Sequence, residues 1–137
     1  MGLAAQCNRP FKARSMPIRG ATQTDNKSEE LKNRVRTHWE QETAGTRYAD
    51  ENEDAAYYAA IEKSRYELEP FILELAGFEQ AAGERVLEIG VGAGTDFSQF
   101  VRHGARAVGV DLTMAAVQHT ARHLKALNIS SGNHDLL

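Results

Sequence analysis

Apolar positions in the first half of the chain recur with helical spacing. Leu31, Val35 and Trp39 stand at four-residue steps among polar residues, which predicts a helix with one apolar stripe. Ser28 precedes two glutamates and is the expected N-cap of that helix, because acidic residues in the first turn complement the helix dipole. We expect Trp39 to anchor this helix against another.

Two shorter helical patterns follow a polar loop. Residues 55–68 form the first pattern and residues 70–78 form the second, with Pro70 in its first turn. We therefore expect residues 29–84 to make an N-terminal helical cap, preceded by a disordered basic tail over residues 1–28.

From residue 85 onward, short apolar runs of strand length alternate with helical patterns. The expected elements are strands at 85–89, 106–111 and 135–137 and helices at 95–103 and 113–127. This alternation predicts right-handed βαβ crossovers and a parallel sheet. The predicted fold class is α/β, a Rossmann-like parallel sheet that is truncated after about two strands and preceded by a helical extension.

Composition and charge narrow the choice of partners. The net charge of −3 argues against a general nucleic-acid binder. No apolar run approaches the roughly 20 residues of a membrane-spanning helix, so no membrane partner is expected. Cys7 is the only cysteine and no secretory signal is visible, which favours a reducing, cytoplasmic location.

The stretch "VLEIGVGAGTD" has the features of a ligand-binding loop. Gly90, Gly92 and Gly94 lie at the carboxyl end of the first expected strand, where open parallel sheets bind their ligands. Glycines at this place permit unusual backbone angles and let a ligand approach closely. A tight turn without a ligand would use the same residues.

The glycine spacing does not fit a dinucleotide. The fingerprint G-x-G-x-x-G would need a third glycine where Thr95 or Phe97 stands. Glu88 would also repel a pyrophosphate, whereas it would suit a ligand that is cationic near the loop.

The same residues carry a family resemblance. "VLEIGVGAGTD" resembles motif I of the class I S-adenosylmethionine-dependent methyltransferases, with Glu88 as the acidic position and Gly90, Gly92 and Gly94 as the glycines. Asp111 matches the acidic residue at the end of that family's second strand. The resemblance implies S-adenosylmethionine as cofactor, and it makes residues 85–137 the first βαβα portion of its binding domain.

The resemblance also implies a role for each matched residue. Glu88 would face the ammonium of the cofactor, Asp111 would accept hydrogen bonds from both ribose hydroxyls, and Leu112 would lie against the adenine. The alternatives are a strand-end carboxylate that caps the next helix for Glu88, a helix N-cap for Asp111 and a core leucine for Leu112. Thr95 and Asp96 would either cap the following helix or contact the cofactor.

Two N-terminal stretches, residues 38–48 and 62–72, resemble the helical extension of small-molecule methyltransferases. The implied acceptor is therefore a small molecule. Aromatic and basic residues in these stretches would close over the cofactor and its carboxylate, or would only pack two helices. They are Arg47, Tyr48, Arg65 and Tyr66.

His119 and His123 stand at metal-ligand spacing on a predicted helix, but no third ligand is evident. A solvated helix face is the favoured interpretation, and no metal is expected.

Some functions cannot be assigned to this stretch of sequence. The resemblance places the substrate pocket and any base beyond the third strand, so no catalytic residue is assigned and the chain is expected to be an incomplete methyltransferase. The alternatives are an NAD(P)-dependent oxidoreductase and a non-catalytic cofactor-binding or partner subunit. The oligomeric state is left open.

Overall fold

The structure is a computed structural model that describes residues 23–43, 46, 55–129 and 132–137. It contains helices, a short 3₁₀ helix (η2) and three strands. In chain order they are α1 (Gln23–Gln41), α2 (Ala55–Leu68), α3 (Phe71–Leu75), η2 (Glu79–Ala81), β1 (Arg85–Ile89), α4 (Thr95–Arg102), β2 (Arg106–Val110), α5 (Met114–Ala126) and β3 (His134–Leu136).

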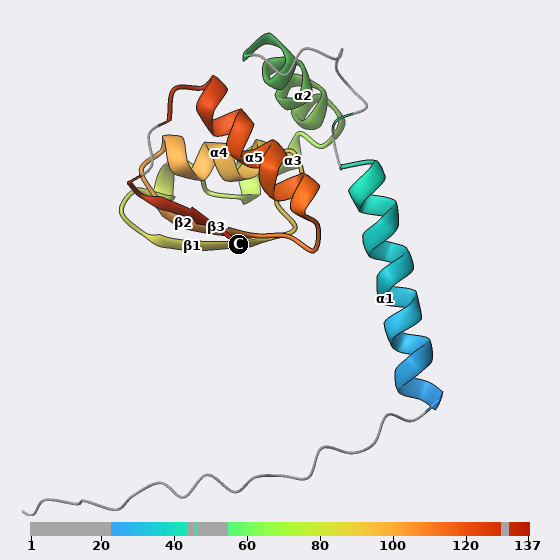
Figure 1. The fold of residues 1–137 in the computed structure, drawn as a ribbon. Coiled ribbons are helices and arrows are strands. Elements are labelled where there is room, and N and C mark those ends of the chain that lie inside the picture. The colour runs from blue at the N-terminus through green and yellow to red at the C-terminus, as the bar shows by residue number, and fades with distance from the viewer. Residues whose placement is uncertain (1–22, 44–45, 47–54, 130–131) are drawn as a thin grey trace, which may run out of the picture.

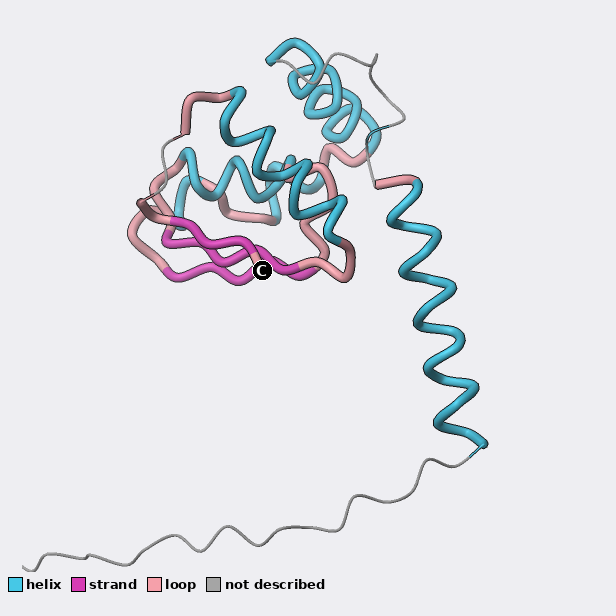
Figure 2. The backbone as a smooth tube through the Cα atoms, in the orientation of Figure 1, coloured by secondary structure: helices cyan, strands magenta, loops and turns pink. Residues whose placement is uncertain are grey.

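The three strands form one parallel sheet in the order β1-β2-β3. Its register pairs Leu87 with Val108 and Val108 with Asp135. Helices α4 and α5 lie together on one face of this sheet, as both ribbon and tube views show (Figures 1 and 2). The prediction of an α/β fold with a Rossmann-like parallel sheet is confirmed.

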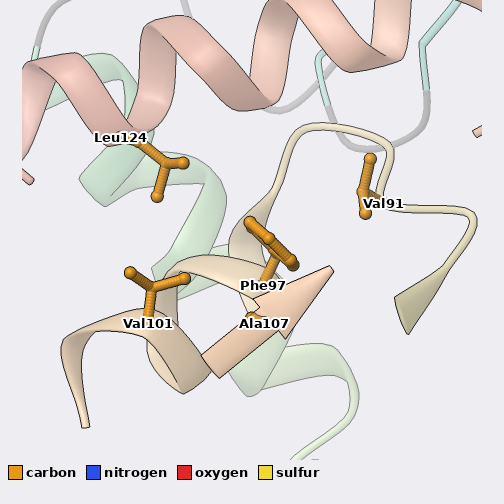
Figure 3. Close-up of a cluster of buried hydrophobic side chains, with 5 residues drawn as sticks. All are labelled: Val91, Phe97, Val101, Ala107 and Leu124. Atoms are coloured by element: carbon orange, nitrogen blue, oxygen red, sulfur yellow. The ribbon is translucent and has the colours of Figure 1, made fainter. Parts of the chain in front are cut away.

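A small apolar core fills the space between the sheet and these two helices (Figure 3). Its buried members are Val91, Phe97, Val101, Ala107 and Leu124. Gly109 of β2 keeps this layer thin, because a Cβ there would lie 2.7 Å from Val91 Cγ1 and 3.0 Å from Phe97 Cε2. The loop after β1 is thus packed directly against the middle strand.

The opposite face of the sheet has no cover from any described element. Leu87 and Ile89 of β1 point to that side and are 63% and 80% exposed. Among the described elements, the helices therefore cover one face of the sheet, and the candidate site described below lies on that side.

Helix α2 packs against the loop after β1. Tyr57, Tyr58 and Ile61 are buried and form a second core cluster with Ala93. The bounds of α2 agree with the predicted helix over residues 55–68. This part of the N-terminal cap is therefore part of the folded body.

Helix α1 extends away from that body and touches it mainly through α5 (Figure 1). It begins at Gln23, so Ser28 lies inside the helix and the predicted N-cap is wrong, as is the predicted start of helical structure after residue 28. Trp39 is 42% exposed, which contradicts a buried helix–helix anchor. The error for Trp39 arises because a single apolar stripe does not say what the stripe contacts.

Other local predictions agree with the structure or differ slightly. Thr113 is the N-cap of α5, and its side chain accepts a hydrogen bond from the Ala116 N–H. Pro70 occupies the N-cap of α3 rather than its first turn. None of the described helices has the length and apolar character needed to cross a membrane.

Candidate functional site

The loop after β1 lines a cavity of about 640 Å³ at the carboxyl end of the strand. Its walls come from three parts of the chain. They include His38 and Trp39 of α1, Ile61 and Arg65 of α2, and Glu88 and Gly90 from the end of β1 onward. The helical cap and the glycine loop therefore face the same cavity.

The three glycines of the loop have different roles. Gly90 (φ +85°) and Gly92 (φ +54°) line the cavity, and a Cβ at Gly90 would meet no atom within 4 Å. Gly94 (φ +77°) does not line it, and a Cβ there would lie 2.8 Å from Thr120 Cγ2. Gly90 leaves its backbone open to a ligand, Gly92 is buried with its N–H and carbonyl already bonded, and Gly94 lets α5 approach the start of α4.

Glu88 has a carboxylate that lacks a partner inside the protein. Its Oε2 is buried without a hydrogen bond from any described residue. Burial raises the pKa of Glu88 to about 8, the nearby charge of Asp96 adds to the increase, and Arg65 opposes it. None of the hydrogen bonds among described residues makes Glu88 a cap for α4. A buried, unsatisfied carboxyl on a cavity wall fits a cationic ligand group.

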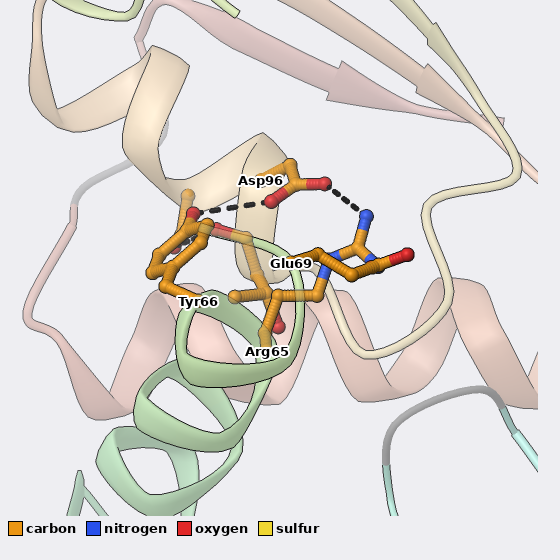
Figure 4. A network of polar contacts seen from close by, with 6 residues as sticks. Arg65, Tyr66, Glu69 and Asp96 are labelled. Carbon is orange, nitrogen blue, oxygen red and sulfur yellow. Dashed lines mark hydrogen bonds and ion pairs between the residues drawn. The ribbon is translucent and has the colours of Figure 1, made fainter. Parts of the chain in front are cut away.

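Arg65 and Tyr66 of α2 are joined to the start of α4 through Asp96 (Figure 4). Arg65 Nη2 lies 2.8 Å from Asp96 Oδ2, and the Tyr66 hydroxyl donates to Asp96 Oδ1 at 3.1 Å. Arg65 also pairs with Glu69. The hydrogen bond to Asp96 raises the pKa of Arg65, and burial followed by the Asp96 charge raises the pKa of Tyr66.

Asp96 is predicted either to cap α4 or to contact the cofactor, and the structure tests the first of these roles. The N-cap position of α4 is Gly94, and it makes no side-chain capping bond. Asp96 instead holds α2 against α4 while lining the cavity. Arg65 also lines the cavity, so it serves the helix contact and remains available to a ligand. The residues Arg47 and Tyr48 lie outside the described part of the chain.

Asp111 links the end of β2 to the glycine loop. Its Oδ2 accepts a hydrogen bond from the Gly92 N–H at 3.2 Å, and its Oδ1 accepts from the Thr113 N–H and hydroxyl at 2.9 and 3.0 Å. Asp111 is therefore not the N-cap of α5, since Thr113 holds that position. Asp111 therefore holds the N-cap residue Thr113 and the glycine loop at the same time.

Leu112 is 49% exposed, which excludes the alternative of a core leucine. Leu112 and Asp111 lie outside the lining of the cavity that contains Glu88. A ligand that contacts all of them must extend from the cavity over the end of β2.

The prediction of a solvated face for His119 and His123 is wrong for His123. This side chain is fully buried and stacks on Tyr58 with a centroid distance of 4.2 Å. Burial lowers the pKa of His123, which keeps the ring neutral. No group of three potential metal ligands occurs among the described residues.

The sequence interpretation gave no site role to several residues that support or line the cavity. Thr120 and His123 share a helix face with Ala116 and Leu124, and all four are buried. Their spacing could have predicted burial, because apolar neighbours at helical intervals enclose both polar side chains. No local sequence pattern predicts that Ile61 lines the cavity.

Comparison with known proteins gives one family. A family model described as "Protein-L-isoaspartate(D-aspartate) O-methyltransferase" matches residues 15–135. The resemblance to class I S-adenosylmethionine-dependent methyltransferases is confirmed, and the match favours methyl transfer over the oxidoreductase alternative. No match to the chain was found among curated proteins or solved structures.

The predicted small-molecule acceptor is wrong. The family that matches is described by a protein substrate, L-isoaspartate or D-aspartate within a polypeptide. The error came from two N-terminal stretches whose likeness to small-molecule enzymes rests on helix-forming, aromatic and basic residues. Such residues describe a helical cap and carry no information about the acceptor.

Proposed function

Because the chain belongs to the protein-L-isoaspartate(D-aspartate) O-methyltransferase family, whose methyl donor is S-adenosylmethionine, we propose that its glycine-loop cavity binds that donor. We further propose that the acceptor is the carboxylate of an isoaspartyl residue in a polypeptide. The observation that carries the donor site is the unpartnered Glu88 carboxylate beside the open backbone of Gly90.

The charge of the cavity supports this assignment. Among the described residues that line it, Glu42, Glu69, Glu88 and Asp96 outnumber the one guanidinium, that of Arg65, so acidic groups are in excess. The amino-acid end of S-adenosylmethionine carries an ammonium, a sulfonium and one carboxylate, a net positive charge. The excess of acid therefore complements the donor, and Arg65 is placed for its carboxylate.

Each site residue then has a proposed contact. Glu88 takes the ammonium, and the open backbone at Gly90 lets the donor approach the loop. Asp111 takes the ribose hydroxyls with lone pairs that its bonds to Gly92 and Thr113 leave free. Leu112 offers its exposed side chain to the adenine.

The proposed acceptor reduces the number of catalytic groups that the protein must supply. S-adenosylmethionine provides a methyl group bonded to a positively charged sulfur. A carboxylate oxygen attacks that carbon, so a C–O bond forms while the C–S bond breaks and its electron pair stays on sulfur. An ionised carboxylate needs no general base, so alignment and exclusion of water are the remaining contributions of the chain.

Two measurements on the full chain test this function. Thermal unfolding should shift upward with S-adenosylmethionine and not with NAD, because only the former has an ammonium that can donate hydrogen bonds to Glu88 and only the latter has a pyrophosphate that Glu88 repels. Transfer of a radiolabelled methyl group should occur to a peptide with an isoaspartyl residue and not to the same peptide with a normal aspartyl residue. A shift with NAD alone would refute the donor site. Binding of the donor without transfer to the isoaspartyl peptide would refute the acceptor and favour a non-catalytic cofactor-binding subunit.

A further inference from the structure

The rear of the glycine loop is held by two polar side chains of α5. Thr120 Oγ1 donates a hydrogen bond to the Gly92 carbonyl at 3.2 Å, and His123 Nδ1 lies 3.0 Å from the Ala93 carbonyl. Both side chains are fully buried. Since a carbonyl only accepts, Nδ1 carries the proton, which leaves Nε2 as a buried acceptor without a partner among the described residues.

The two bonds hold successive peptides of the loop. Thr120 holds the peptide between Gly92 and Ala93, and His123 holds the peptide between Ala93 and Gly94. In a planar trans peptide the C=O and the following N–H point in opposite directions. The Gly92 carbonyl points at Thr120, so the Ala93 N–H points away from α5. Gly92 and Ala93 both line the cavity on the other side of the loop.

The neighbouring loop amides already have partners. The Gly92 N–H donates to Asp111, and the Gly94 N–H donates to the Val91 carbonyl at 2.8 Å. None of the hydrogen bonds in the described part of the chain uses the Ala93 N–H. This amide is therefore a loop donor that a ligand in the cavity can use.

The contact between the loop and α5 is too tight to shift freely. A Cβ on Gly94 would lie 2.8 Å from Thr120 Cγ2 and 2.9 Å from Thr120 Oγ1. Thr120 is thus confined by the start of α4, and its hydroxyl has little room to choose another acceptor.

Helix α2 fixes the histidine from the other side. The Tyr58 ring is stacked on the His123 ring with an interplanar angle of 6°, and the Tyr58 hydroxyl donates to the His119 carbonyl at 3.2 Å. Tyr58 also belongs to the buried cluster that contains Ala93. The orientation of the loop is therefore connected to the docking of the helical cap.

We propose that Thr120 is a positioning residue that aims the Ala93 N–H into the cavity, and that His123, held by Tyr58, fixes the next peptide of the loop and so keeps the Ala93 N–H in this direction. The proposal rests on the proposed function, since the ligand that receives this hydrogen bond is the amino-acid end of S-adenosylmethionine. It predicts that α5 sets donor affinity without touching the donor.

Matched variants separate the effect of losing a hydrogen bond from the effect of losing packing. Thr120→Val and His123→Leu remove the donors at similar size, whereas Thr120→Ser and His123→Asn keep a donor near the same place. The dissociation constant of each full chain is measured by calorimetry below its unfolding transition, for S-adenosylmethionine and for 5′-methylthioadenosine. The second ligand lacks the amino-acid end, so a purely structural defect would weaken both ligands alike.

Thr120→Val and His123→Leu should each weaken S-adenosylmethionine about fivefold to tenfold, the value of one hydrogen bond. They should change 5′-methylthioadenosine by less than about twofold, and the Ser and Asn variants should stay near wild type for both ligands. If Thr120→Val does not fold, Thr120→Ala replaces it, because it removes the hydroxyl without placing a methyl group there.

Equal losses for the two ligands, or wild-type affinity in Thr120→Val and His123→Leu, would overturn the positioning role while leaving the donor site intact. An equal loss in the Ser and Asn variants would do the same, because packing would then account for the effect. Failure of the wild-type chain to bind S-adenosylmethionine would overturn the proposed function, and the inference with it.

Discussion

Helices α1 and α2 border the same cavity in different ways. Helix α2 buries Tyr58 and Ile61 against the glycine loop and is tied to α4 through Arg65 and Asp96. Helix α1 has exposed side chains along its described length, and only its carboxyl end, with His38 and Trp39, reaches the cavity. Both segments are predicted as helices from their sequence, but a helical pattern alone does not say which helix packs against the folded body.

The rigidity of the site comes from the buried contacts of α2. A side chain that is packed on all sides holds its neighbours in one arrangement, whereas an exposed one can adapt at low cost. Helix α2 should therefore control both stability and donor affinity. Helix α1 should affect donor affinity slightly and stability hardly at all.

The largest expected effect comes from the buried face of α2. Ile61→Ala should lower the free energy of unfolding by about 2–5 kcal/mol, because it leaves a cavity beside the loop. Val35→Ala, a matched truncation on exposed α1, should change it by less than about 0.5 kcal/mol. Urea denaturation measures both, and Ile61→Val, at about 0.5–1.5 kcal/mol, provides a milder test if Ile61→Ala does not fold. Equal effects at the two helices would remove the distinction between them.

Glu88, which faces Arg65 of α2, should make donor affinity depend on pH. Its pKa of about 8 in the ligand-free chain means that a proton must leave before the carboxylate can pair with an ammonium. Affinity for S-adenosylmethionine should therefore rise by up to about tenfold per pH unit between roughly pH 6 and pH 8. Calorimetric titrations across this range measure the slope, and Glu88→Gln corrects for titration of the donor itself. A slope that survives in Glu88→Gln would assign it to another group.

The same carboxyl predicts how stability changes with pH. The pKa of Glu88 is higher in the folded chain than its ordinary value of 4.5, so the folded state holds the proton more tightly. The stabilisation is complete below pH 4.5 and is lost as pH rises through about 8. Urea midpoints of wild type should thus fall relative to Glu88→Gln over this interval. A constant difference between the two curves would contradict the raised pKa.

Much of the α/β part could be predicted because its signals are local. The strand ends, the glycine triplet and Thr113 as N-cap each depend on residues close together in the chain. The stacking of Tyr58 on His123 and the contact of Gly94 with Thr120 join residues from separate elements. No periodicity of a single segment contains such pairings, so the rear of the site had to be seen in the structure.

The ion pair between Arg65 of α2 and Asp96 of α4 should contribute less to the free energy of unfolding than the buried side chain of Ile61. A double-mutant cycle with Arg65→Gln and Asp96→Asn should give a coupling free energy of about 1 kcal/mol, since the Arg65 side chain is 39% exposed and screened by water. Urea denaturation supplies the four values. Lys32 and Glu29 on α1, which are both more than half exposed, form the control pair and should show less coupling. Stronger coupling on α1 would reverse the comparison.

The smallest expected effect lies at the end of α1. Trp39→Phe should weaken S-adenosylmethionine by about twofold to threefold, because a partly exposed wall residue loses contact area without leaving a buried void. Equilibrium dialysis with labelled donor gives the dissociation constants. A loss as large as that of a buried α2 residue would show that α1 closes firmly over the cavity.

The most direct test is calorimetric titration of the full chain with S-adenosylmethionine at pH 8.5, for wild type and Glu88→Gln. We expect one donor per chain and a dissociation constant at least about tenfold higher in the variant, as expected for loss of a charge-assisted hydrogen bond. Equal affinities in the two proteins would show that the buried Glu88 carboxylate does not recognise the donor.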